Sequence, residues 1–341
     1  MTIRRSAWLR TLAVFAAMLL LLAACGGGDD GGGTTDGGDD GEAPAEPTDV
    51  QLILDFVPGG IHAGIFSAQE EGYFEEANLN VDIQSPTSSA DTLRLVLAGQ
   101  ATIGIAPIAD VASLRAQGEE IQIFLALDQV PLAALMSTEA IGITDPSQLE
   151  GGTVGVTGVP SDGASARVIL EDSGVDPHSV EFITIGFDAV ANLIGKSVDA
   201  AIGFWSAEAV VLELEGETPI IFRPDEYGAP PYPELVFFAS TETIEQRPEV
   251  VEAFSQALVR GYEFALDNTD QAIDHLVANA DGADAEFATA EFENVRDHFL
   301  GPNGSFGEVS DEAIADYLEW AAEVGVIESV PEGLVTTEFV P

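Results

Sequence analysis

Short apolar runs alternate with helix-like segments along the chain from residue 50, and this alternation occurs twice. In the first half the apolar runs lie at residues 50–56, 81–83, 101–106 and 121–127. After a turn signal at residues 145–147 they lie at residues 152–156, 181–185, 198–204 and 219–222. Strands separated by helices of about ten residues are typical of parallel βαβ units. The alternation therefore predicts an α/β fold built from two similar halves.

The remainder of the chain predicts a return to the first half. A proline-rich loop at residues 223–233 precedes an apolar strand at 235–239, and residues 243–326 have mostly helical patterns. We therefore predict two α/β lobes with a ligand cleft between them and a helical C-terminal return. Lobe 1 takes residues 50–130 and 235–341, and lobe 2 takes residues 131–234. Open α/β sheets bind ligands at the carboxyl ends of their strands, so the loops there are the first candidates for a site.

The first 25 residues predict an export signal. Arg4, Arg5 and Arg10 precede an uncharged run at residues 11–24, which is shorter than the about 20 apolar residues of a membrane-spanning helix. The sequence LAAC at residues 22–25 resembles the lipobox of prokaryotic lipoproteins. This resemblance implies a signal peptide over residues 1–24 and lipidation of Cys25, with an ordinary signal peptide as the alternative. The export route, general secretory or twin-arginine, stays open.

A tether is expected between Cys25 and the folded body. Residues 26–49 contain no aromatic residue, no aliphatic residue larger than alanine and no basic residue. Such a segment cannot bury enough apolar surface to offset the entropy of ordering it. We therefore expect residues 25–49 to be a disordered acidic tether, with the protein held by its lipid at the outer face of the cell membrane.

The charge balance excludes several classes of partner. The chain has 59 acidic and 11 basic residues, and 51 acidic and eight basic residues remain from residue 50 onward. Binding to nucleic acid or to anionic lipid needs a cationic surface, so neither is expected as a partner. One cysteine cannot form an internal disulfide, and we expect no metal and no cofactor. Concentrated salt screens self-repulsion at this charge density, which suggests a salt-tolerant source with an acidic proteome.

A series of motifs in fixed order gives the chain a family resemblance. They are Leu54, Asp55, Phe56, Pro58, Gly59, His62 and Gly64 in the first loop, then GYF at residues 72–74, AGQATIGI at 98–105, LEGGTVGV at 149–156 and GKSVDAA at 195–201. The chain resembles the solute-binding proteins of ABC transporters that share a fold with thiamine-pyrimidine synthase. The resemblance implies the type II periplasmic-binding-protein fold, a monomer, and an ABC permease with its ATPase as partners.

Three further stretches point to one branch of that family. They are GVPSD at residues 158–162, GFWSAE at 203–208 and the loop at 222–235. These stretches resemble those of members that bind thiamine pyrimidine precursors, and also those of relatives assigned to riboflavin. The resemblance implies a small heteroaromatic solute, with an aminopyrimidine of the hydroxymethylpyrimidine type as the first choice. Riboflavin, another heterocycle or a sulfonate-type solute is the alternative.

The candidate site residues agree with a flat heteroaromatic ligand. Ring faces come from Phe56, Trp205 and Tyr232, and carboxylates that accept from an amine or a ring N–H come from Asp55, Asp162 and Glu208; His62 can donate or accept. For each of these residues, a role as a helix cap, in the core or on the surface is the structural alternative.

An enzyme is the competing class of function. The pyrimidine synthase that shares this fold is, as a family property, cytosolic, and it uses iron and a cysteine-rich motif. The present sequence has an export signal and no cysteine after Cys25, so we expect a binding protein and no catalytic residues.

Overall fold

The computed structural model describes residues 46–340, which belong to one compact unit. The expected signal peptide, Cys25 and most of the expected tether lie outside the described residues. The first strand, β1, begins at Thr48, two residues before the predicted start of the folded body. Within residues 46–340, no helix combines the length and the apolar character that crossing a bilayer requires.

The first sheet has the strand order β2-β1-β3-β10-β4. Its strands are β1 (Thr48–Ile53), β2 (Leu79–Gln84), β3 (Ile103–Pro107), β4 (Ile121–Ala126) and β10 (Leu235–Ser240). β1 runs parallel to β2 and β3, whereas β10 is antiparallel to β3 and β4. The late strand β10 thus enters the middle of a sheet that otherwise forms from the first third of the described chain.

The second sheet has the order β7-β6-β8-β5-β9. Its strands are β5 (Ala133–Thr138), β6 (Thr153–Val156), β7 (Glu181–Thr184), β8 (Ala200–Phe204) and β9 (Pro219–Phe222). Strand β5, which is antiparallel to β8 and β9, was not predicted from the sequence. All six residues of β5 are buried, but its sequence, AALMST, contains no valine, isoleucine or aromatic residue, the types that mark the strands predicted from their apolar runs.

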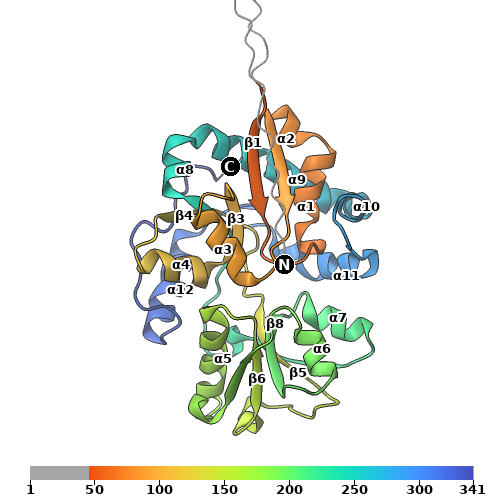
Figure 1. The fold of residues 1–341 in the computed structure, drawn as a ribbon, viewed down its shortest axis with the longest axis vertical. Helices are drawn as coiled ribbons and strands as arrows, with labels where there is room; N and C mark the ends of the chain where they lie inside the picture. Colours follow the sequence, from red (N-terminus) through yellow and green to blue (C-terminus); the bar gives the residue numbers. More distant parts are fainter. Residues whose placement is uncertain (1–45, 341) are drawn as a thin grey trace, which may run out of the picture. The chain divides into compact units, whose positions relative to one another are not determined.

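Helices cover the two sheets and complete the described chain (Figure 1). The α-helices are α1 (Ala63–Glu70), α2 (Tyr73–Glu76), α3 (Ser89–Leu97), α4 (Ile108–Ala116), α5 (Pro160–Asp172), α6 (Ala189–Ile194), α7 (Glu208–Leu214), α8 (Thr241–Gln246), α9 (Pro248–Asp267), α10 (Thr269–Asn279), α11 (Ala285–Val295) and α12 (Asp311–Glu323). Short 3₁₀ turns are η1 (Gly60–His62), η2 (Pro146–Leu149), η3 (Pro177–Ser179), η4 (Pro224–Tyr227) and η5 (Arg296–His298). The predicted α/β fold with two lobes and a helical C-terminal return is confirmed, with mixed rather than purely parallel sheets.

Close packing of α1 against α9 fixes the start of α1. A Cβ atom on Gly64 would lie 2.4 Å from the ring of Tyr262, and one on Gly261 would lie 2.2 Å from the carbonyl oxygen of Gly64. Only glycine allows backbones to approach this closely. The Tyr262 hydroxyl donates to the carbonyl oxygen of Ile61 at 2.8 Å, so the long helix α9 also holds the turn η1.

Two buried carboxylates join the segments that connect the sheets. The chain leaves the first sheet between β4 and β5 and returns between β9 and β10. Asp128, after β4, accepts from the amides of Glu234 and Leu235, both at 2.9 Å. Glu234 Oε2 accepts from the amides of Leu132 and Ala133 at 3.3 and 3.2 Å. The outgoing and returning segments are therefore bonded directly to each other.

Candidate ligand-binding site

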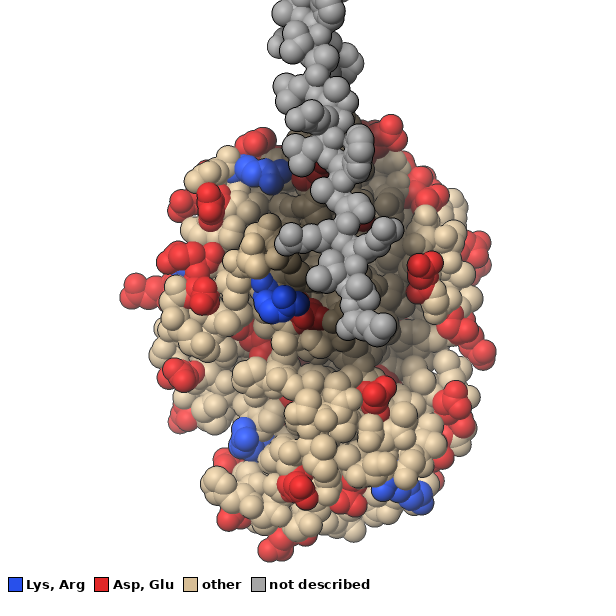
Figure 2. Space-filling view, viewed as in Figure 1, with Lys and Arg blue, Asp and Glu red and all other residues tan. Residues whose placement is uncertain are grey.

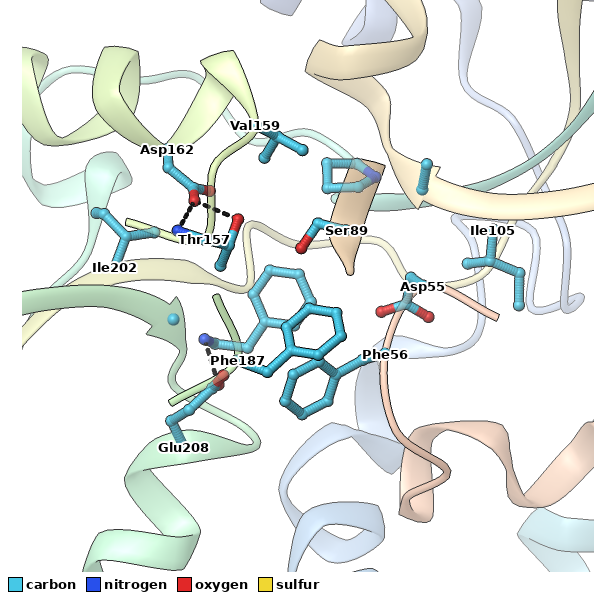
Figure 3. A pocket seen from close by; sticks show the side chains of 14 residues that line it. Asp55, Phe56, Ser89, Ile105, Thr157, Val159, Asp162, Phe187, Ile202 and Glu208 are labelled. Carbon is cyan, nitrogen blue, oxygen red and sulfur yellow. Dashed lines mark hydrogen bonds between the residues drawn. The ribbon is translucent and has the colours of Figure 1, made fainter. Parts of the chain in front are cut away.

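One pocket lies where strands of both sheets end. It contains about 500 Å³ of space, part of it open to solvent. Asp55 and Phe56 follow β1, and Thr157 follows β6, while Pro107 and Phe204 are the last residues of β3 and β8. The carboxyl ends of parallel strands in α/β sheets form such crevices. Each sheet thus contributes one wall of the pocket (Figure 3).

Asp55 is held in place by His62. The Nε2 atom of His62 lies 2.9 Å from Oδ1 of Asp55, and His62 Nδ1 accepts from the amide of Gly59 at 3.2 Å. Because Nδ1 accepts, Nε2 carries the proton and donates to the carboxylate. His62 is only 1% exposed and does not line the pocket, whereas Asp55 does. Of these two predicted site residues, Asp55 therefore lines the pocket and His62 orients it.

Glu208 reaches the pocket from the opposite lobe. It is the first residue of α7, and its Oε2 accepts from the amide of Phe204 at 2.7 Å. A Cβ atom on Gly203 would lie 2.9 Å from Glu208 Cδ, so the glycine leaves room for the carboxyl group. Burial, together with the charges of Asp162 and Asp55, raises the pKa of Glu208 from 4.5 to about 7, and the hydrogen bond from the Phe204 amide acts in the opposite direction.

Asp162 lines the same wall of the pocket and accepts hydrogen bonds from Thr157, in the loop that precedes α5. Its Oδ2 accepts from the amide of Thr157 at 2.6 Å and from the Thr157 hydroxyl at 2.5 Å (Figure 3). Burial raises the pKa of Asp162, and the bonds from Thr157 act in the opposite direction. For Asp55 and Glu208, the second carboxylate oxygen accepts no hydrogen bond from another described residue. That oxygen remains available to a donor in the pocket.

Two phenylalanine rings meet inside the pocket. Phe56 from lobe 1 and Phe187 from lobe 2 are edge to face, with ring centroids 4.6 Å apart and planes at 81°. In the view of Figure 3 the two rings lie between the carboxyl groups of Asp55 and Glu208. Phe187 was not among the predicted site residues, although it lies just beyond β7, where loops at the carboxyl ends of strands are candidates for a site.

Trp205 and Tyr232 are not in the lining of this pocket. The Trp205 Nε1–H donates to the carbonyl oxygen of Pro131 at 2.9 Å, and the Arg223 guanidinium lies 5.0 Å from the centre of its indole. The ring of Tyr232 is buried against Tyr317, with centroids 3.8 Å apart. Both rings thus lie beside the segments that join the lobes, and their predicted contact with a ligand stays a prediction.

The lining of the pocket carries negative and no positive side chains. Among the described residues that line it, none is lysine, arginine or histidine. On the face drawn in Figure 2, acidic side chains are scattered over both lobes and outnumber the basic ones. An anionic ligand would find no cationic partner in this pocket, whereas an amine or a ring N–H would find a carboxylate.

This fold, with a pocket between two α/β lobes, is that of periplasmic binding proteins. The model of the NMT1/THI5-like family matches residues 60–272, and the chain belongs to that family, as the sequence motifs predicted. The formylaminopyrimidine-binding protein of Halalkalibacterium halodurans is 30% identical over 276 residues, which is 80% of this chain and 84% of that protein. A 4-amino-5-hydroxymethyl-2-methylpyrimidine phosphate synthase of Legionella pneumophila is 26% identical over 67% of this chain and 72% of the synthase.

Solved structures agree on the fold. The alkanesulfonate-binding protein SsuA of Xanthomonas axonopodis, bound to MOPS, superposes with a TM-score of 0.67 at 14% identity, over 86% of this chain and 99% of SsuA. A Candida albicans protein described as having the generic periplasmic binding protein fold gives a TM-score of 0.65 at 18% identity, over 85% and 96% of the two chains.

Proposed function

We propose that the chain is the extracytoplasmic solute-binding component of an ABC importer and captures an aminopyrimidine precursor of thiamine. One observation carries the proposal: the pocket combines a phenylalanine ring from each lobe with the carboxylates of Asp55, Asp162 and Glu208. The solute named for the Halalkalibacterium relative supports the same ligand class.

The chemistry of an aminopyrimidine matches these groups. Its flat ring offers two faces for stacking, and aromatic contacts of this kind favour offset or edge-to-face geometry. Its exocyclic amine donates two hydrogen bonds, which the unengaged oxygens of Asp55 and Glu208 can accept. Because these two carboxylates come from different lobes, a ligand that bonds both would favour lobe closure.

A receptor is favoured over a synthase by the charge of the pocket. Several relatives are named as phosphate synthases, whose named product carries a phosphate group. A phosphate ester needs cationic or amide donors, and the described lining offers carboxylates and phenyl rings instead. Sulfonates are disfavoured for the same reason. We therefore propose that the chain is not an enzyme and that its solute is not phosphorylated.

Isothermal titration calorimetry in molar KCl tests the proposal. The ligands are 4-amino-5-hydroxymethyl-2-methylpyrimidine, its phosphate ester, formylaminopyrimidine, riboflavin and taurine. We expect binding of the unphosphorylated pyrimidines, weakened by about tenfold or more in Glu208→Gln, which removes a charge from a hydrogen bond. Glu213→Gln, on the exposed side of the same helix, is the control and should bind as wild type. Binding of riboflavin alone would leave a solute receptor with a different ligand.

The place of the protein in the cell is also a proposal. We infer that residues 1–24 direct export, that Cys25 carries the lipid, and that the monomeric body meets an ABC permease and its ATPase at the outer face of the membrane. The likeness to exported binding proteins supports this view. Labelling of cells with a radioactive fatty acid should mark wild type and leave Cys25→Ser unlabelled; equal labelling of both would refute lipidation.

We further propose the division of the body into lobe 1 (residues 50–130 and 235–341) and lobe 2 (residues 131–234). The composition of the two sheets supports this division.

The acidic body supports the proposal of a salt-tolerant source, for which the melting midpoint should rise from low to molar KCl. A flat midpoint would contradict it.

A further inference from the structure

Helix α5 begins without a cap from its own loop. Its N-cap residue is Val159, which has no polar side chain, and its first residue is Pro160. The first N–H groups of a helix have no partner within the helix and need one from elsewhere. The first amide that α5 can offer is therefore that of Ser161.

The missing cap comes from the other lobe. Asp110 lies on α4, directly after β3 of the first sheet, and both oxygens of its carboxylate face Ser161. Its Oδ2 accepts from the Ser161 hydroxyl at 2.8 Å, and its Oδ1 accepts from the Ser161 amide at 3.4 Å. An aspartate that accepts from the first turn of a helix is a normal capping arrangement. Here, however, Asp110 follows a strand of the first sheet, whereas α5 follows a strand of the second.

The contact is shielded from water. Asp110 is 2% exposed and Ser161 is 8% exposed. Apolar residues of both helices join one hydrophobic cluster beside it, including Ala109 and Ala112 of α4 and Ala164 and Val168 of α5. A hydrogen bond to a buried carboxylate is stronger than one at the surface, and breaking it leaves the remaining partner unsatisfied.

The first turn of α5 is also a wall of the pocket. Val159 and Asp162, on either side of Ser161, both line the pocket, whereas neither Asp110 nor Ser161 does. Any movement that separates α4 from α5 breaks the cap and moves these two lining residues away from Asp55 and Phe56. The contact thus links the junction of the lobes to the shape of the site.

We propose that Asp110 is a positioning residue of this pocket: it caps α5 across the lobe boundary and holds the lobe 2 wall against lobe 1. The predicted effect of Asp110 on ligand binding rests on the function proposed above. The capping of α5 by Asp110 rests only on the geometry of α4 and α5.

Hydrogen exchange of the full-length protein, followed by mass spectrometry without ligand, tests the cap. We expect the amides at the start of α5 to exchange about tenfold faster in Asp110→Ala, with β6 unchanged. Asp110→Asn keeps one acceptor oxygen and should restore much of the protection. Asp145→Ala, which removes a cap inside lobe 2, is the control and should leave α5 as in wild type. Equal exchange in wild type and Asp110→Ala would overturn the proposal.

Calorimetric titration with 4-amino-5-hydroxymethyl-2-methylpyrimidine tests positioning. We expect Kd to rise about tenfold in Asp110→Ala, and Ser161→Ala to add little in the double variant because the two residues act as one unit. A residue that only stabilised the fold would lower the melting midpoint and leave Kd unchanged; that result, with faster exchange, would overturn the positioning role. If wild type does not bind this pyrimidine, the proposed ligand fails, and the exchange result still decides the cap.

Discussion

The imidazole of His62 donates to the carboxylate of Asp55 across 2.9 Å, and both side chains are buried. The histidine is in turn fixed by the amide of Gly59, so three residues of one loop determine where the Asp55 carboxylate lies. A ligand that bonds to Asp55 would meet an acceptor whose direction is already set, which reduces the entropy lost on binding.

His62→Ala should weaken both the fold and the site. Removing the imidazole leaves Asp55 and the Gly59 amide without their buried partner, which costs roughly 1–3 kcal/mol of unfolding free energy. We also expect pyrimidine affinity to fall, because the Asp55 carboxylate is no longer oriented. Urea denaturation and calorimetry measure the two effects. His178→Ala, at an exposed position in lobe 2, is the control; equal behaviour of the two variants would contradict this role.

Phe187→Ala should reduce affinity with little effect on stability. The ring is only half-buried and its recorded aromatic partner is Phe56 across the cleft. Loss of an aromatic contact and its buried surface predicts a Kd about tenfold higher. Phe187→Leu should lie between the two, because it keeps apolar volume but no ring face. Phe264→Ala, on α9 and outside the pocket, should bind as wild type; unchanged affinity in Phe187→Ala would remove Phe187 from the site.

Trp205→Phe separates two roles for the indole. The substitution keeps a ring but removes the N–H that donates to Pro131. If Trp205 acts at the junction of the lobes, as its contacts indicate, we expect a modest loss of affinity, about threefold to fivefold, corresponding to roughly 1 kcal/mol for one hydrogen bond. A loss of about a hundredfold would instead favour the direct ligand contact predicted from the sequence.

Stability should fall as the pH rises, and Glu291 should account for part of this. Glu291 is buried on α11, and burial, with the charges of Asp55 and Glu208, raises its pKa from 4.5 to about 8. A carboxyl group with a raised pKa in the folded state binds more protons folded than unfolded. The contribution of Glu291 to the free energy of unfolding is therefore complete below pH 4.5 and is lost as the pH rises through about 8. We expect a lower melting midpoint at pH 8.5 than at pH 5.5.

Glu291→Gln should remove part of that pH dependence. The amide keeps an acceptor for the Ile61 N–H but cannot ionise. At pH 8.5 the ionised Glu291 carboxylate destabilises the folded state of wild type, and glutamine does not. We expect the melting midpoint of the variant to be higher by about 2–4 °C for each 1 kcal/mol of this destabilisation. Calorimetric melts across the pH range measure this effect, with exposed Glu286→Gln on the same helix as the control. Parallel curves for wild type and Glu291→Gln would exclude the role of Glu291.

The sequence predicted those parts of the site that follow from local rules. Asp55, Phe56, Asp162 and Glu208 were selected because they belong to motifs that follow predicted strands and because their side chains suit a heteroaromatic ligand, and all four line one pocket. Trp205 satisfied the same rule, but its ring turns to the Pro131 carbonyl, and no local pattern reports which way a loop side chain points.

Long-range contacts could not be predicted from the sequence. The cap of α5 by Asp110 joins residues 51 positions apart, and nothing in either segment indicates the other. Strand β5 was missed because its sequence, AALMST, contains no valine, isoleucine or aromatic residue to mark it as a strand. The order of the strands, including the insertion of β10 between β3 and β4, depends on sheet pairing rather than on local propensity.

The most direct test of the central claim is calorimetric titration of wild type and Glu208→Gln with 4-amino-5-hydroxymethyl-2-methylpyrimidine and its phosphate ester. The account predicts one-to-one binding of the free pyrimidine by wild type, a Kd about tenfold or more higher in Glu208→Gln, and much weaker binding of the phosphate ester. Equal or tighter binding of the phosphate ester, or no binding of the pyrimidine, would contradict the account.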